Sequence, residues 1–108
     1  MKRFLAILTV LAVVLVAFAA CGGGSTTTMT MGTGGTQGTY YAYGGILGNQ
    51  LKTATGITVN VVSTDGSKAN ILGVDTGNYQ LGTVQSDVMA YAAAGTRTFE
   101  AEGAIDSF

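Results

Sequence analysis

Three short polar stretches in this chain of 108 residues carry groups that could bind a small molecule. They are Thr33–Gly45 (TGGTQGTYYAYGG), Ser63–Ser67 (STDGS) and Gln85–Asp87 (QSD). Hydroxyl or amide side chains occur in all three, and the glycines of the first two leave backbone N–H groups accessible. Such groups can hydrogen-bond a ligand carboxylate, and the Asp87 carboxylate could pair with a ligand ammonium group.

The glycines of the first stretch do not match the common phosphate-binding patterns. The dinucleotide fingerprint G-x-G-x-x-G fails because the last glycine, Gly38, comes one residue too late. A P-loop needs Gly-Lys before Ser or Thr, and no glycine in this chain precedes a lysine. Two interpretations remain. One is a glycine turn that only starts a capped helix; the other is a carboxylate site formed by helix N–H groups with Thr36, Gln37 and Thr39.

Aromatic and acidic residues in these stretches also have two interpretations each. Tyr43 fits core packing on a helix. Tyr40, at the start of that helix, could cover a ligand with its ring and donate a hydrogen bond from its hydroxyl. Asp87 could bind a ligand, or it could simply be stabilised by the dipole of the helix that it starts.

The composition argues against catalysis, metal binding and nucleic-acid binding. The chain has no histidine and one cysteine, which excludes Ser-His-Asp and Cys-His arrangements and leaves a structural zinc ion without ligands. Asp65 and Asp87 could form a carboxylate pair, but no second feature points to hydrolysis. Five basic residues against six acidic ones give a net charge of −1, without a basic patch for nucleic acid. We therefore expect a binding protein that uses no cofactor, not an enzyme.

The three polar stretches follow predicted strands and begin predicted helices. Alternating apolar and β-branched residues predict strands over Thr28–Thr33, Ile57–Ser63 and Tyr79–Val84. Helical spacing predicts helices over Tyr40–Ala54, Ser67–Thr76 and Ser86–Ala94, with Thr39 as the first N-cap. Glycines follow each helix, at Gly56, Gly77 and Gly95.

This β-α-β-α-β-α order predicts an α/β unit whose parallel sheet is covered on both faces. Ligands bind such sheets outside the carboxyl ends of the strands, so the polar turns at Gly34–Thr39, Ser63–Ser67 and Gln85–Asp87 should face one crevice. Gly44, Gly45 and Gly48 each cost about 1 kcal/mol of helix propensity, which predicts that the first helix packs closely on the sheet. The segment Thr96–Phe108 has little pattern.

The N-terminal residues have the composition of a secretory signal. Lysine and arginine precede an apolar run that reaches Ala20, and small residues flank Cys21 in a way that resembles the lipobox of bacterial lipoproteins. We expect residues 1–20 to be a lipoprotein signal peptide, Cys21 to be the lipid attachment site, and residues 21–27 to be a flexible tether. The alternatives are a membrane anchor helix and a plain signal peptide with an unmodified cysteine.

Two motifs in order along the chain resemble the TAXI family, the extracytoplasmic solute-binding subunits of TRAP transporters. They are TGGTQGTYY, beginning at Thr33, and VQSD, beginning at Val84. The strand end before Ser63, the Gly66-Ser67 turn and Asn70 add to the resemblance, which extends over about residues 28–95. The resemblance implies the fold of a type II periplasmic binding protein, in which two α/β lobes close on a ligand.

The resemblance also implies a function. The ligand would be a small organic acid or an amino acid such as glutamate, which a TRAP permease in the membrane then takes up. Family members are longer, so residues 28–108 would be an incomplete, truncated N-terminal lobe that binds ligand weakly or not at all by itself. The protein would lie outside the cytoplasm, lipid-anchored to the bacterial cell membrane.

The family's ligand-binding residues carry over onto all three polar stretches. They would be Thr36, Gln37, Gly38, Thr39 and Tyr40, then Ser63, Gly66 and Ser67, and finally Gln85, Ser86 and Asp87. The alternative from another functional class is a surface lipoprotein with only a structural or interaction role.

Overall fold

A computed structural model of the chain describes residues 27–107. The predicted signal peptide, the lipid attachment at Cys21 and all but the last residue of the predicted tether lie outside the described residues. Between residues 27 and 107, no helix is long and apolar enough to cross a membrane.

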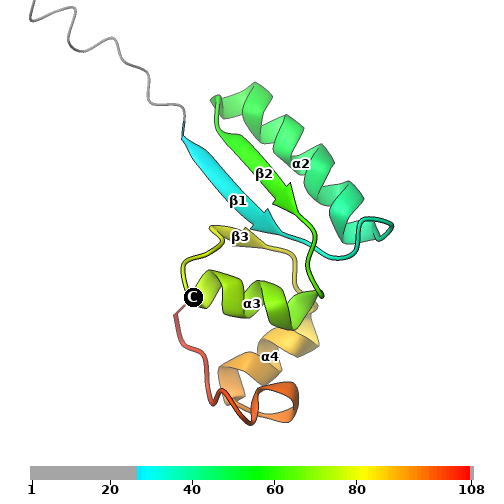
Figure 1. Ribbon diagram of the computed structural model, residues 1–108. Coiled ribbons are helices and arrows are strands. Elements are labelled where there is room, and N and C mark those ends of the chain that lie inside the picture. The colour runs from blue at the N-terminus through cyan, green and yellow to red at the C-terminus, as the bar shows by residue number, and fades with distance from the viewer. Residues whose placement is uncertain (1–26, 108) are drawn as a thin grey trace, which may run out of the picture.

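The described residues form an α/β unit in the predicted β-α-β-α-β-α order (Figure 1). The three strands are parallel and lie in the order β2-β1-β3. The elements are β1 (Thr28–Gly32), α2 (Thr39–Thr55), β2 (Thr58–Val62), α3 (Ser67–Asp75), β3 (Leu81–Gly82), α4 (Ser86–Ala94) and the 3₁₀ turn η1 (Arg97–Phe99).

Helices cover both faces of the sheet, as the sequence predicted. Successive side chains of a strand point to opposite faces. In β1, Met31 faces Gly44 of α2, whereas Gly32 faces Asn70 of α3. The two helices therefore lie on opposite sides of β1, and α4 packs against α3 (Figure 1).

Two glycines bring α2 close to the sheet. A Cβ atom on Gly44 would lie 2.8 Å from Thr33 Cγ2, and one on Gly48 would lie 3.4 Å from Val59 Cβ. The prediction of close packing is confirmed for these two residues. It is wrong for Gly45, where a Cβ would meet no atom within 4 Å, because the next residue along a helix points about 100° away from the contact face.

The third strand is much shorter than the predicted Tyr79–Val84. Only Leu81 and Gly82 pair with β1 in the ladder. The backbone of Tyr79 instead donates a hydrogen bond to the carbonyl of Gly73 in α3. The carbonyl of Thr83 accepts one from the side chain of Asn70. The N–H groups of Gln80 and Thr83 still bond to the β1 carbonyls of Thr30 and Gly32. The flanks of the strand are therefore shared between β1 and α3, which a pattern of apolar residues does not reveal.

The ends of the helices agree closely with the glycine pattern. Gly56 and Gly95 cap the C-termini of α2 and α4 in the left-handed conformation, with φ of 77° and 62°. Helix α3 ends one residue before the predicted Thr76, which is its C-cap, and Gly77 follows with a φ of 76°. Glycine is favoured in these conformations because it has no Cβ.

The segment after α4 completes the core beside α3 and α4. Phe99 is fully buried and Ile105 is nearly so, and both pack with Ile71 and Ala92. The backbone of Ile105 also donates a hydrogen bond to the carbonyl of Ala92, at 2.9 Å. The burial of these two residues could not be predicted from the sequence, because two apolar residues in an irregular segment produce no periodicity.

A lysine at the start of α3 contacts three residues of the segment after α4. Lys68 Nζ lies 2.8 Å from Glu102 Oε1, donates a hydrogen bond to the carbonyl of Thr98, and lies 5.4 Å from the centre of the Phe99 ring. The hydrogen bond from Lys68 lowers the pKa of the Glu102 carboxyl.

Gly44→Ala and Gly45→Ala form a matched pair that tests the packing of α2. Each adds one methyl group to the same helix and gains about 1 kcal/mol of helix propensity. At Gly44 the methyl group has no room, so overpacking should make this variant less stable than Gly45→Ala by about 1–3 kcal/mol. Denaturant unfolding of both proteins measures the difference, and equal stabilities would contradict the close contact.

The Lys68–Glu102 ion pair predicts stability that depends on pH. Because the pKa of Glu102 is lowered in the folded state, the carboxylate stabilises the fold at neutral pH, and this contribution is lost as the pH falls through that pKa. Glu102→Gln should therefore lower the midpoint of thermal unfolding at neutral pH and have no effect in acid. Glu100→Gln is the control, since Glu100 is exposed and forms no ion pair within residues 27–107. An equal effect of both substitutions would refute the role of the pair.

Candidate functional site

The carboxyl ends of the three parallel strands bring the three polar stretches to one edge of the sheet. Ser63 Oγ donates a hydrogen bond to the carbonyl of Gly34 at 3.0 Å, which joins the second stretch to the first. The backbone N–H of Gln85 donates to Ser67 Oγ at 3.0 Å, which joins the third stretch to the second. Hydrogen bonds therefore link the three polar stretches of the candidate site in series.

Each of the three helices begins at this edge without a side-chain cap. The N-cap residues are Gly38 for α2, Gly66 for α3 and Gln85 for α4, and none makes a capping hydrogen bond with its side chain. The prediction of Thr39 as the first N-cap is wrong. The N–H of Gly38 closes a turn by bonding to the carbonyl of Gly35 at 2.8 Å, and the helix then starts at Thr39.

Most of the predicted ligand-binding side chains face solvent. The exposed ones are Thr36, Gln37, Thr39, Ser63, Gln85, Ser86 and Asp87, and the backbone of Gly38 is exposed as well. Ser67 differs, because it is 8% exposed and its Oγ accepts the bond from Gln85. Its oxygen thus holds two of the polar stretches together.

Two tyrosines of α2 differ in exposure, and the prediction for Tyr43 is wrong. Tyr43 was expected in the core, but it is 54% exposed, and Ile46 is 61% exposed beside it on the outer side of the helix. Glycines, not large side chains, occupy the face of α2 that meets the sheet. Tyr40 is half-buried, and a Cβ atom on Gly34 would lie 3.6 Å from its Cβ and 3.8 Å from its ring atom Cδ2. Its ring therefore lies against the first polar stretch.

A buried asparagine connects the ends of all three strands. Asn70 is 0% exposed. Its Nδ2 donates hydrogen bonds to the carbonyls of Thr33 at 2.5 Å and Thr83 at 2.8 Å. Its Oδ1 accepts one from Thr64 Oγ1 at 2.6 Å. Both polar ends of the carboxamide are therefore satisfied, and each bond reaches a residue just beyond a different strand.

Sequence reasoning missed this network, although two features of the sequence could have indicated it. A threonine stands within two residues of the end of each observed strand, at Thr33, Thr64 and Thr83. Asn70 interrupts the apolar side of a short helix, and a polar residue there must find hydrogen-bond partners if it is buried. Thr33 is itself 0% exposed and donates from Oγ1 to the carbonyl of Val62 at 2.7 Å.

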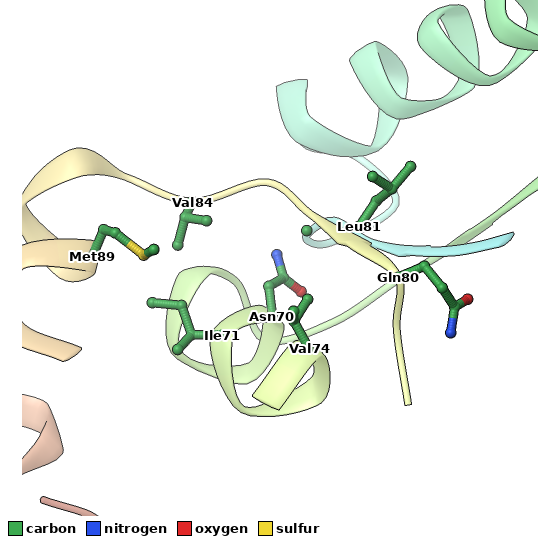
Figure 2. Close-up of a pocket in the computed structure, with 8 residues that line it drawn as sticks. Asn70, Ile71, Val74, Gln80, Leu81, Val84 and Met89 are labelled. Carbon is green, nitrogen blue, oxygen red and sulfur yellow. The ribbon is translucent and has the colours of Figure 1, made fainter. Parts of the chain in front are cut away.

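A hollow of about 220 Å³ lies beside β3, and Asn70 and Val84, the residue before Gln85, are among the residues that line it. Its lining is mostly apolar and comes from α3, β3 and the start of α4, with Ile71, Val74, Leu81 and Met89 around it (Figure 2). None of the predicted ligand-binding residues lines it. In the described part of the chain, no three His, Cys, Asp or Glu residues gather in a way that could hold a metal ion.

A family model identifies the kind of protein to which this unit belongs. The model of the NMT1-like family matches residues 31–108, a range that contains all three polar stretches and Asn70. The chain belongs to the NMT1-like family. This family is related to the TAXI and NMT1 solute-binding proteins, so membership indicates a protein of the solute-binding kind with a periplasmic-binding-like α/β fold.

Proposed function

We propose that this NMT1-like protein is the extracytoplasmic solute-binding component of a TRAP-type secondary transporter of the TAXI kind. Its ligand would be a small organic acid or an amino acid such as glutamate. One observation carries the proposal: three helices begin at the same edge of the sheet, and no side chain caps any of them. Helix N-termini carry partial positive charge and free N–H groups, which attract a carboxylate.

The first polar stretch is the best-suited place for the ligand carboxylate. It has two exposed hydroxyl side chains, Thr36 and Thr39, an exposed amide, Gln37, and the exposed N-cap Gly38. Its backbone can be approached closely, since a Cβ on Gly35 would meet no atom within 4 Å.

The third polar stretch adds a group of opposite charge. Asp87 is exposed in the first turn of α4, and its carboxylate could pair with an ammonium group. An amino acid presents both a carboxylate and an ammonium group, so it matches the two stretches better than a simple carboxylic acid does.

The proposal includes the location of the protein and its partners. The lipid on Cys21 would hold it at the outer side of the bacterial cell membrane, where it would deliver solute to the TRAP permease subunits. Binding and release require no nucleophile or general base, in keeping with a chain that has no histidine. We therefore propose no catalytic role.

Titration with sodium L-glutamate tests the proposed ligand, with NMR spectra of the backbone amides as the readout. We expect saturable chemical-shift changes concentrated in residues 34–40, 66–67 and 85–87, because these segments form the proposed site. This readout detects weak binding as well as strong. Sodium chloride at equal ionic strength is the control, and identical changes with both salts would refute the proposal.

Gly38→Asp tests the start of α2 directly. An aspartate at the N-cap supplies an acceptor to the first-turn N–H groups and places a negative charge where the ligand carboxylate would bind. Stability should change by only a few tenths of a kcal/mol, since a Cβ here would lie 3.1 Å from the Gly35 carbonyl and needs a small adjustment. Glutamate affinity should fall about tenfold or more.

Gly38→Asn is the matched variant, because it caps the helix without adding charge. We expect its affinity to lie between those of the wild-type protein and Gly38→Asp. Undiminished affinity in both variants would show that the ligand does not bind at the start of α2.

A second candidate function rests on the outer side of α2. Tyr43 and Ile46 expose more than half of their surface there, which favours contact with another macromolecule. A surface lipoprotein with an interaction role would present this side and would give no specific response to glutamate.

A further inference from the structure

We propose that Asn70 is a positioning residue for ligand binding: its buried carboxamide fixes the placement of the three polar stretches relative to one another. This inference rests on the proposed function, because it concerns the same site. Asn70 itself is fully buried, so it acts on the ligand only through the backbone that it holds.

The first argument is the convergence of the hydrogen bonds. The carbonyl of Thr33 accepts a hydrogen bond from Asn70 Nδ2 at 2.5 Å, and the hydroxyls of Thr64 and Thr83 lie 3.1 Å and 3.4 Å from the same oxygen. The carboxamide of Asn70 reaches all three threonines. The three strand ends therefore meet at one carbonyl group and one side chain.

The three threonines also lie close along the chain to the predicted ligand-binding residues. Thr33 stands three residues before Thr36, and Thr83 stands two before Gln85. Thr64 Oγ1 accepts a hydrogen bond from the N–H of Gly66, which is the N-cap of α3. Thr33 and Thr64 belong to the first and second polar stretches, and Thr83 stands just before the third, so a shift of any of them must move the stretch to which it is joined.

The third argument is the space made for this side chain. A Cβ on Gly32 would lie 2.5 Å from Asn70 Oδ1, and a Cβ on Gly82 would lie 3.2 Å from Asn70 Cβ. Two strands thus lack side chains where α3 inserts its carboxamide. The fit is specific for asparagine, because two carbonyl oxygens face its NH₂ group and a hydroxyl faces its oxygen.

Asn70→Asp is the sharpest test, because aspartate has the same shape but offers no donor to the two carbonyls. In the ligand-free chain, we expect the amide NMR shifts of all three polar stretches to change. Affinity for L-glutamate should fall about tenfold or more, measured at a temperature where the variant is folded.

Ile71→Ala is the matched control for a merely structural effect. Ile71 is the next residue of α3 and is 2% exposed, and its apolar side chain packs with Ala92, Phe99 and Ile105 and makes no hydrogen bond to the threonines. This variant should unfold at a lower temperature than the wild-type protein and yet keep the amide shifts of the first two polar stretches and the glutamate affinity. An equal loss of affinity in both variants, or unchanged amide shifts in Asn70→Asp, would overturn the inference.

Thr64→Val keeps the inference testable if Asn70→Asp does not fold. It removes the donor to Asn70 Oδ1. The Thr64 side chain forms no hydrogen bond with the third stretch, Gln85–Asp87. If Asn70 passes on the effect of the substitution, the amide chemical shifts of this stretch should nevertheless change. Shifts confined to the first two stretches would contradict the inference. If the wild-type chain does not respond to glutamate, the proposed function fails, but the amide shifts of the ligand-free variants still decide the role of Asn70.

Discussion

The buried carboxamide of Asn70 is the constraint on which the arrangement of this unit depends. An amide group removed from water destabilises the fold unless it is hydrogen-bonded. Here the carboxamide forms its hydrogen bonds with three residues that stand beside the ends of the three strands. Among residues 27–107, no buried side-chain nitrogen or oxygen lacks a partner. The hydrogen bonds of Asn70 hold helix α3 in its observed register, and Gly32 and Gly82 leave the space that this register needs.

The helices that start at this edge of the sheet give it free N–H groups and partial positive charge. Gly44 and Gly48 let α2 approach β1 and β2 closely, and Asn70 fixes α3 on the other face. A helix N-terminus with a side-chain cap satisfies its own N–H groups, but these three helices have no such cap. The stabilisation that a cap would give is absent at the edge where we propose that the ligand binds.

The remaining core packs α3 against α4 and the segment that follows α4. Phe99, Ile105, Ile71 and Ala92 close the far side of α3 against α4, and Lys68 fastens the last segment through Glu102. The fold thus separates a rigid apolar region from an open polar edge.

The sequence by itself determined the order of the elements, the glycines that end the helices, and the meeting of three polar stretches at one edge. These follow from local periodicity and from the rule that parallel strands place their carboxyl ends together. Only the tertiary structure decided which glycines of α2 touch the sheet, that Tyr43 faces solvent, and that Phe99 is buried. It also decided that Asn70 joins Thr33, Thr64 and Thr83. Each of these depends on contacts between residues that are distant in sequence, or on a rotation of one residue about a helix, and neither leaves a local pattern.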